Sequence, residues 1–165
     1  MMLAIRMSHF GTAHLLPDAS LAVFLLGGLL LRRGYFFIIL MLLAFGMDVY
    51  VARNATDIGC VLSQPISVAL PAYGVLWLTG VGLAGRQRYA QPLLALSASV
   101  IGVGLAFIIS NAFWYALSGK FVALNLIEFS LRVVKYFPPY LGSAMLYLAP
   151  ALIAGGFWRK ARVVA

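Results

Sequence analysis

The chain carries a series of long apolar runs separated by short links that contain arginine, and this pattern limits its fold more than any other feature. Crossing the hydrocarbon core of a bilayer takes about 20 apolar residues in a helix. The whole chain is 64% hydrophobic and 10% charged, with a mean hydropathy of +1.00. We therefore expect an all-α, polytopic membrane bundle of five to six spans, built as one integral membrane domain over residues 1–165. The clear runs are 19–31, 35–52, 65–85, 92–110 and 140–158.

The same composition and the absence of several motifs exclude many classes of protein. Lys and Arg sit in small clusters between apolar runs, which is typical of membrane topology and not of nucleic-acid binding. Cys60 is the single cysteine, so the chain has no internal disulfide and no C-x-x-C pair. The sequence has no H-E-x-x-H motif and no Walker A loop, and it has too few buried carboxylates for a proton relay. We expect a transport protein or a structural subunit, not an enzyme.

The distribution of charge predicts the orientation in the membrane. The links at 32–34 and 86–91, together with the C-terminus, hold seven positive charges and no acid. The other ends of the runs hold five positive charges and all four acids. Positively charged loops stay in the cytoplasm, so we expect the C-terminus inside and the N-terminus outside.

Residues 121–137 form an amphipathic segment. Glu128, Arg132 and Lys135 are spaced by four and three residues and share one helical face. We expect a helix that lies at the outer interface or lines a cavity, and that ends at Pro138-Pro139. Making this segment a sixth full span would reverse the links upstream and move the positive link at 86–91 outside, which the charge pattern disfavours.

Three pairs of small residues at a spacing of four suit close helix packing. Two interpretations remain open, packing inside the bundle or docking of a partner membrane subunit. The pairs are Gly80 with Ala84, Ala98 with Gly102, and Ala151 with Gly155.

Candidate functional residues collect at the expected outer side. Asp48 lies near the end of its apolar run, where a carboxylate is a functional candidate, although a pair with Arg53 or Arg132 or a place at the headgroups also explains it. Cys60 follows Gly59 in a polar connection, and its thiol is a candidate nucleophile or soft metal ligand. His14 could contact a ligand singly.

Aromatic residues gather near the same side of the membrane. An interfacial aromatic belt explains much of this pattern. The alternative is a roof over a cavity for a large, partly planar ligand, formed by an expected loop at 111–120 together with the Cys60 connection. The aromatic residues are Tyr50, Tyr73, Trp77, Phe113, Trp114, Tyr115, Tyr136, Phe137 and Tyr140.

Several stretches resemble a known family of transporters. They are His14-Leu-Leu-Pro-Asp-Ala-Ser-Leu-Ala-Val-Phe, Asp57-Ile-Gly-Cys60, Leu70-Pro-Ala-Tyr-Gly-Val-Leu-Trp-Leu, Ile108-Ile-Ser-Asn-Ala-Phe-Trp-Tyr-Ala-Leu-Ser-Gly-Lys-Phe and residues 132–141. They are similar to the small solitary S-component cobalamin transporters, the BtuM-like branch of the energy-coupling-factor group. The similarity covers residues 14 to about 145. Two features depart from the family pattern: five clear runs where six spans are usual, and no clean Ala-x-x-x-Ala motif in the first run.

The resemblance implies a compact helical bundle in the bacterial inner membrane that binds cobalamin, vitamin B12, in an outward-facing pocket. Cys60 would coordinate the cobalt and could help to expel cyanide from cyanocobalamin. The family's cycle needs a coupling membrane subunit with paired ATPases, and it implies no intrinsic cofactor. The other contacts of the ligand would come from Asp48, Tyr73, Trp114, Tyr115, Arg132 and His14. The alternatives are an S-component-like carrier for another vitamin or metabolite, and a non-transporting structural subunit.

Overall fold

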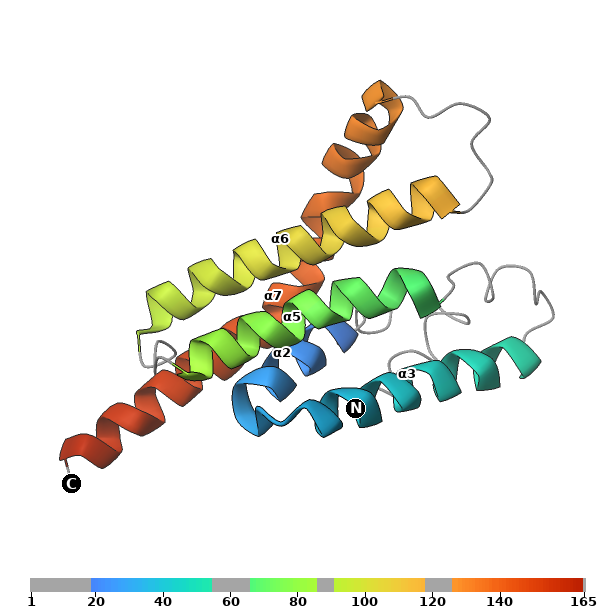
Figure 1. Ribbon diagram of the computed structural model, residues 1–165. Helices are drawn as coiled ribbons and strands as arrows, with labels where there is room; N and C mark the ends of the chain where they lie inside the picture. Colours follow the sequence, from blue (N-terminus) through green and yellow to red (C-terminus); the bar gives the residue numbers. More distant parts are fainter. Residues whose placement is uncertain (1–18, 55–65, 86–90, 118–125, 165) are drawn as a thin grey trace.

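The computed structural model describes residues 19–54, 66–85, 91–117 and 126–164, and these residues form five α-helices (Figure 1). No strand occurs among them. The fold is therefore all-helical, as the apolar runs predict. The helices are α2 (Ser20–Leu31), α3 (Gly34–Asn54), α5 (Ile66–Gly85), α6 (Pro92–Leu117) and α7 (Leu126–Val164).

Helix α6 is longer than the sequence predicts, so the expectation of a loop beginning at Asn111 is wrong for residues 111–117. The polar side chains there bond to the helix itself. The Ser110 hydroxyl and the Asn111 amide both donate to the carbonyl oxygen of Phe107, at 3.0 and 2.9 Å. Polar groups that bond locally in this way are tolerated inside an apolar helix, and no proline interrupts the segment.

Helix α7 continues through Pro138-Pro139, so the expectation that these prolines end the amphipathic helix is also wrong. Each proline removes one hydrogen bond to the preceding turn, which bends a helix. The first and last turns of α7 run in different directions in Figure 1. Phe137 and Tyr140, on either side of the pair, both pack on Phe107 of α6, with ring centroids 5.5 and 4.8 Å apart. This shared contact holds the two halves together as one bent helix.

The centre of the molecule is the contact between α2 and α5. A Cβ atom on Gly28 would meet the carbonyl oxygen of Trp77, and one on Gly80 would meet that of Leu25. The two backbones therefore touch, which only glycine permits at these positions. Ala84 is 1% exposed beside them. Internal packing is the confirmed role of the Gly80 and Ala84 pair.

Aromatic rings fill the core next to this contact. Phe24 of α2 is fully buried and stacks on Tyr73 of α5, with centroids 4.2 Å apart and planes 8° apart. Phe37 of α3 lies 5.8 Å from Phe24 and 5.6 Å from the ring of Trp77. These contacts join α3 to the pair of central helices.

The contacts also fix the directions of the helices. Phe24 meets Tyr73 and Arg32 meets Ala84, so α2 and α5 run parallel. Gly102 packs on Thr79, and α6 runs antiparallel to α5 (Figure 1). The last third of α7 reaches the C-terminal end of α2, where Gly155 and Arg32 line the same groove. The ends of α2, α5 and α7 therefore lie at one end of the bundle.

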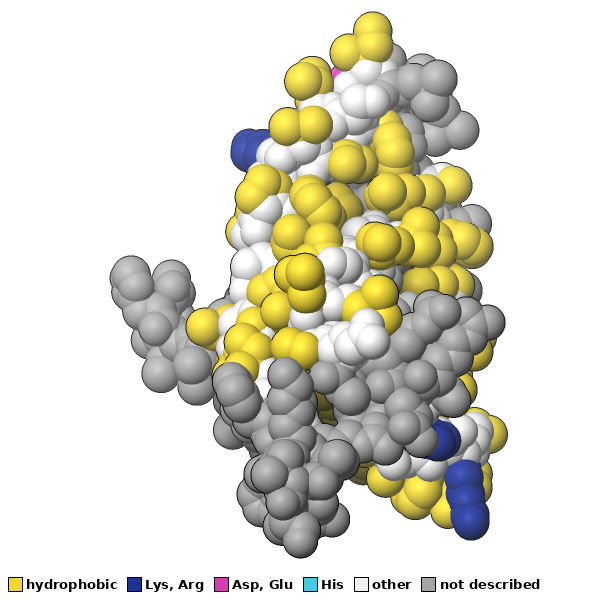
Figure 2. Space-filling view, turned by 90° about the vertical axis from the view of Figure 1, so that its left-hand side faces the viewer, with side chains coloured by type: hydrophobic (Ala, Val, Ile, Leu, Met, Phe, Trp, Pro, Cys, Tyr) yellow, Lys and Arg dark blue, Asp and Glu magenta, His cyan; other side chains and the backbone are white. Residues whose placement is uncertain are grey.

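The outer surfaces of the helices are apolar. Residues with exposed fractions above 60% include Leu42, Leu78, Leu93 and Ile101. Hydrophobic side chains cover most of the described surface in Figure 2, and the few Lys and Arg side chains lie towards its upper and lower parts. Two segments, Pro92–Phe113 and Ile127–Gly155, are long and apolar enough to cross a membrane. Helix α2, with 12 residues, is about 18 Å long and shorter than the hydrocarbon core.

Candidate functional site

Four of the predicted site residues lie in terminal turns of α3, α6 and α7. Asp48 is in the last two turns of α3, Trp114 and Tyr115 are in the last turn of α6, and Arg132 is in the second turn of α7. In Figure 1 the ends of α3 and α6 lie opposite the end at which α5 finishes and α6 begins, and the first turns of α7 rise on the other side of α6 from α3. The backbone therefore does not bring Asp48 and Arg132 together, and the side chains of all four residues lie outside the described part of the structure.

The remaining polar candidates, Cys60 and His14, lie outside the described residues. Cys60 belongs to the connection between α3, which ends at Asn54, and α5, which begins at Ile66. Both of these helix ends lie at the same end of the bundle as the end of α6 (Figure 1). Within the described residues, no group of three His, Cys, Asp or Glu side chains could hold a metal ion. The cobalt-ligand role of Cys60 stays a prediction.

Tyr73 is the one candidate whose side chain the structure describes. It is 9% exposed and stacks on Phe24, one turn before Trp77, which is also buried. An aromatic belt at the lipid interface is therefore the wrong interpretation for Tyr73 and Trp77, because both rings pack in the protein core. Tyr50, Phe113 and Tyr136 are exposed, as a belt requires. A ligand contact by Tyr73 stays a prediction.

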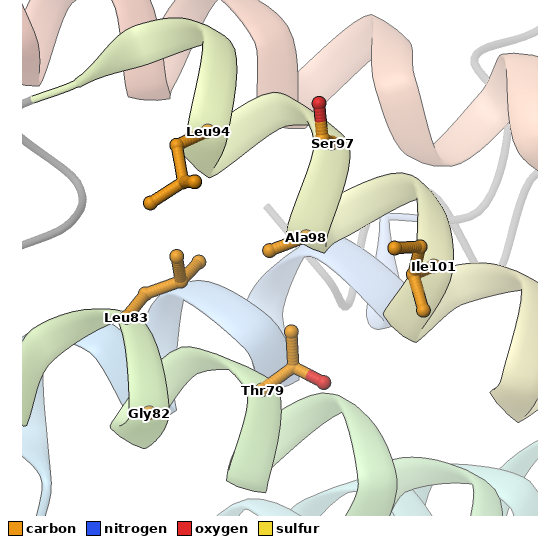
Figure 3. Close-up of a pocket in the computed structure, with 7 residues that line it drawn as sticks. All are labelled: Thr79, Gly82, Leu83, Leu94, Ser97, Ala98 and Ile101. Atoms are coloured by element: carbon orange, nitrogen blue, oxygen red, sulfur yellow. The ribbon is translucent and has the colours of Figure 1, made fainter.

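A cavity of about 440 Å³ lies between α5 and α6 (Figure 3). Leu83 and Leu94 face each other across it, and its walls are almost entirely apolar. Its two hydroxyl groups donate to their own helices: Thr79 to the carbonyl of Val75 at 2.8 Å, and Ser97 to that of Leu93 at 2.9 Å. The cavity therefore offers an incoming molecule shape and apolar contact, with no hydroxyl donor left to orient it.

A groove of about 360 Å³ lies between the C-terminal half of α2 and the second half of α7. Four leucines and two small residues line it, and Arg32 is the one charged residue in its wall. A guanidinium nitrogen of Arg32 donates to the carbonyl oxygen of Ala84 at 2.9 Å. The arginine thus satisfies a carbonyl that the last turn of α5 leaves without a partner. The lining residues are Leu26, Leu29, Leu30, Arg32, Ala151, Leu152 and Gly155.

Neither of these two cavities contains a predicted site residue. Their volumes fall in the range that holds drug-sized molecules, about 300–1,000 Å³, and cobalamin is larger than such molecules. The cavity is lined by the half of α5 that leads to Gly85, and the groove is lined by the half of α2 that leads to Arg32. Sequence reasoning missed the groove at Arg32, because the charge pattern places the C-terminus and the 32–34 link on one side but does not indicate that α7 packs against α2.

The comparisons with known proteins add no family. The sequence matches none of the models of known protein families, and no curated protein is significantly similar to it.

Proposed function

We propose that the protein is a multi-pass carrier of the bacterial inner membrane that binds cobalamin from the outer side and mediates its uptake. The observation that supports this proposal most is that the ends of α3 and α6, which carry Asp48, Trp114 and Tyr115, lie opposite the end marked by Arg32, as do the two helix ends that flank the Cys60 connection. The resemblance of residues 14 to about 145 to solitary cobalamin transporters supplies the identity of the ligand.

Placement across the membrane is supported by the surface and by the polar groups. Leu42 of α3 and Leu93 and Ile101 of α6 are large apolar side chains that are exposed, and a bilayer would cover them. The exposed Ser97 hydroxyl donates to its own helix, which is how a polar group is satisfied where no water is present. Five helices would then form the spans or parts of spans, with the Arg32 end in the cytoplasm.

Cys60 would supply the chemistry of binding. A thiolate is a soft ligand that suits a polarisable cobalt centre. On cyanocobalamin, the thiolate would donate an electron pair to cobalt while cyanide leaves with its own pair, so the exchange needs no oxidant or reductant. Asp48, Tyr73 and Arg132 would contact the periphery of the ligand, with Trp114, Tyr115 and His14. A coupling membrane subunit with ATPases would supply energy, because the chain has no Walker A loop.

Absorbance of a bound corrinoid tests the proposal directly. We expect protein purified after growth with cobalamin to carry the visible spectrum of a corrinoid, and Cys60→Ser to change the cobalt-sensitive bands and weaken retention. Ser63→Ala, in the same connection as Cys60, is the matched control and should behave as wild type. A colourless wild-type protein that cobalamin does not stabilise would contradict the proposal, and stabilisation by another vitamin would favour the alternative carrier.

A further inference from the structure

The groove between α2 and α7 combines an apolar wall with a positive charge at one end of the bundle. Leu26, Leu29 and Leu152 supply the apolar wall, and Ala151 and Gly155 leave it open because they have almost no side chain. Arg32 stands at the end of α2, where the helix stops and the chain turns into α3. From this arrangement we propose that the groove binds the acyl chain of an anionic phospholipid, with its phosphate on Arg32.

The position of Arg32 fits contact with a headgroup. Its side chain is exposed. One of its guanidinium nitrogens donates a hydrogen bond to a backbone carbonyl, that of Ala84. A guanidinium has five N–H donors in a planar fork, so donors remain for two phosphate oxygens. Arg33 follows it, also exposed, and raises the local positive charge. Basic sites at the cytoplasmic ends of membrane helices attract anionic headgroups.

The backbone at Arg32 supports a role for its side chain. Arg32 has a φ of 55°, in the left-handed region, and it is the one such non-glycine residue among the described residues. A residue with a Cβ atom is disfavoured there by roughly 1–2 kcal/mol relative to glycine. Gly34 lies two residues later, so the link between α2 and α3 contains a glycine, but the left-handed position is occupied by Arg32. The arginine at this strained position donates to the carbonyl of Ala84 and lines the groove.

A lipid chain suits the groove better than a helix from a partner. The groove is lined by residues from α2 and α7, and its wall is apolar up to the single arginine at the end of α2. One apolar tail with one anionic head matches that distribution of polarity. This inference rests on the membrane placement proposed above and is independent of cobalamin.

Binding of matched lipids tests the inference. The full chain in a neutral detergent is mixed with dioleoyl phosphatidylglycerol or dioleoyl phosphatidylcholine, and bound lipid is counted by native mass spectrometry. We expect phosphatidylglycerol to bind about fivefold more tightly, since one arginine near a membrane surface contributes on that order. Gly155→Leu fills the groove and should remove this preference. Gly142→Leu, on the same helix, is the control, because the Cβ positions of both glycines meet no atom within 4 Å.

Charge variants and competition by inorganic phosphate distinguish a lipid headgroup from a free phosphate ion as the ligand of Arg32. Arg32→Gln should abolish the preference for phosphatidylglycerol and Arg33→Gln should leave most of it. Equal binding of the two lipids, or a preference that survives Gly155→Leu, would overturn the inference. Inorganic phosphate that competes fully with phosphatidylglycerol, or a second copy of the chain bound in place of lipid, would overturn it as well. A wild-type protein that binds cobalamin but shows no preference for phosphatidylglycerol would contradict the lipid inference and leave the proposed function standing.

Discussion

At the scale of single residues, glycine and arginine determine how the two central helices meet. Gly28 and Gly80 let the backbones of α2 and α5 touch near their crossing point. At the end of the same contact, Arg32 bonds to the carbonyl of Ala84 and ties the end of α2 to the end of α5. Close backbone packing is the main source of helix association where no hydrophobic driving force acts between helices. Substitutions along this contact are therefore the most informative.

Gly80→Ala should destabilise the protein. The new Cβ atom would meet the carbonyl oxygen of Leu25 and lie 2.7 Å from the backbone nitrogen of Leu29, and neither atom can move without shifting α2. Overpacking of this kind lowers the free energy of unfolding by about 1–3 kcal/mol. We expect it to be measured as a lower midpoint of thermal unfolding in detergent. Gly82→Ala is the control, because its Cβ atom meets nothing within 4 Å. Equal stability of the two variants would contradict the close contact.

Two substitutions at Arg32 separate its side chain from its backbone. Arg32→Ala removes the bond to Ala84 and keeps the strained left-handed φ of 55°, so we expect a loss of about 1 kcal/mol in the free energy of unfolding. Arg32→Gly also removes the bond but relieves the strain, and its stability should lie close to wild type. Chemical unfolding in detergent measures both. A glycine variant less stable than the alanine variant would be inconsistent with this backbone geometry.

At the scale of helices, the sequence predicts where the elements begin more reliably than where they stop. The apolar runs match α2, α3 and α5 to within two residues, because hydropathy is a local property. The ends of α6 and α7 depend on contacts that are distant in sequence or specific to one side chain, such as Phe107 with Phe137 and Tyr140. A proline pair predicts a helix end from local geometry, and packing on both sides of it gives a bend instead.

The bend in α7 can be measured directly. In a Cys60→Ser background, spin labels at Ile127→Cys and Ile153→Cys, both exposed positions of α7, report the distance along the helix. A straight helix would separate these backbones by roughly 39 Å, and we expect a shorter distance in the native chain. Replacing Pro138 and Pro139 with alanine restores two hydrogen bonds and should lengthen it. An unchanged distance would place the cause of the bend elsewhere.

The short central helix is the feature of the fold that the sequence does not reveal. Helix α2 has the fewest residues, yet Phe24, Leu25 and both of its glycines are buried. Hydropathy identifies it only as a short apolar helix, because a membrane span is recognised by the length of its apolar run and not by burial. Its position in the core depends on small residues that allow α5 to pack closely against it. The sequence of one apolar run does not indicate which other run packs against it. Likewise, the sequence does not reveal that Tyr73 packs in the core.

At the scale of the whole molecule, the two ends of the bundle differ in chemistry. One end holds Arg32 and the last turns of α5 and α7, and the other receives the ends of α3 and α6, which carry Asp48 and Trp114. The parallel contact of α2 and α5 agrees with the prediction that the positive links share a side. The central claim of the account is that this positive end faces the cytoplasm and the opposite end faces outwards.

Labelling of a single thiol tests that claim most directly, because Cys60 is the only cysteine of the chain. A membrane-impermeant maleimide applied to intact spheroplasts should label the wild-type protein. The same reagent should label Arg33→Cys, in a Cys60→Ser background, only after the membrane is permeabilised. Labelling of Arg33→Cys in intact spheroplasts, with Cys60 protected until permeabilisation, would contradict the proposed orientation and with it an outward-facing site for cobalamin.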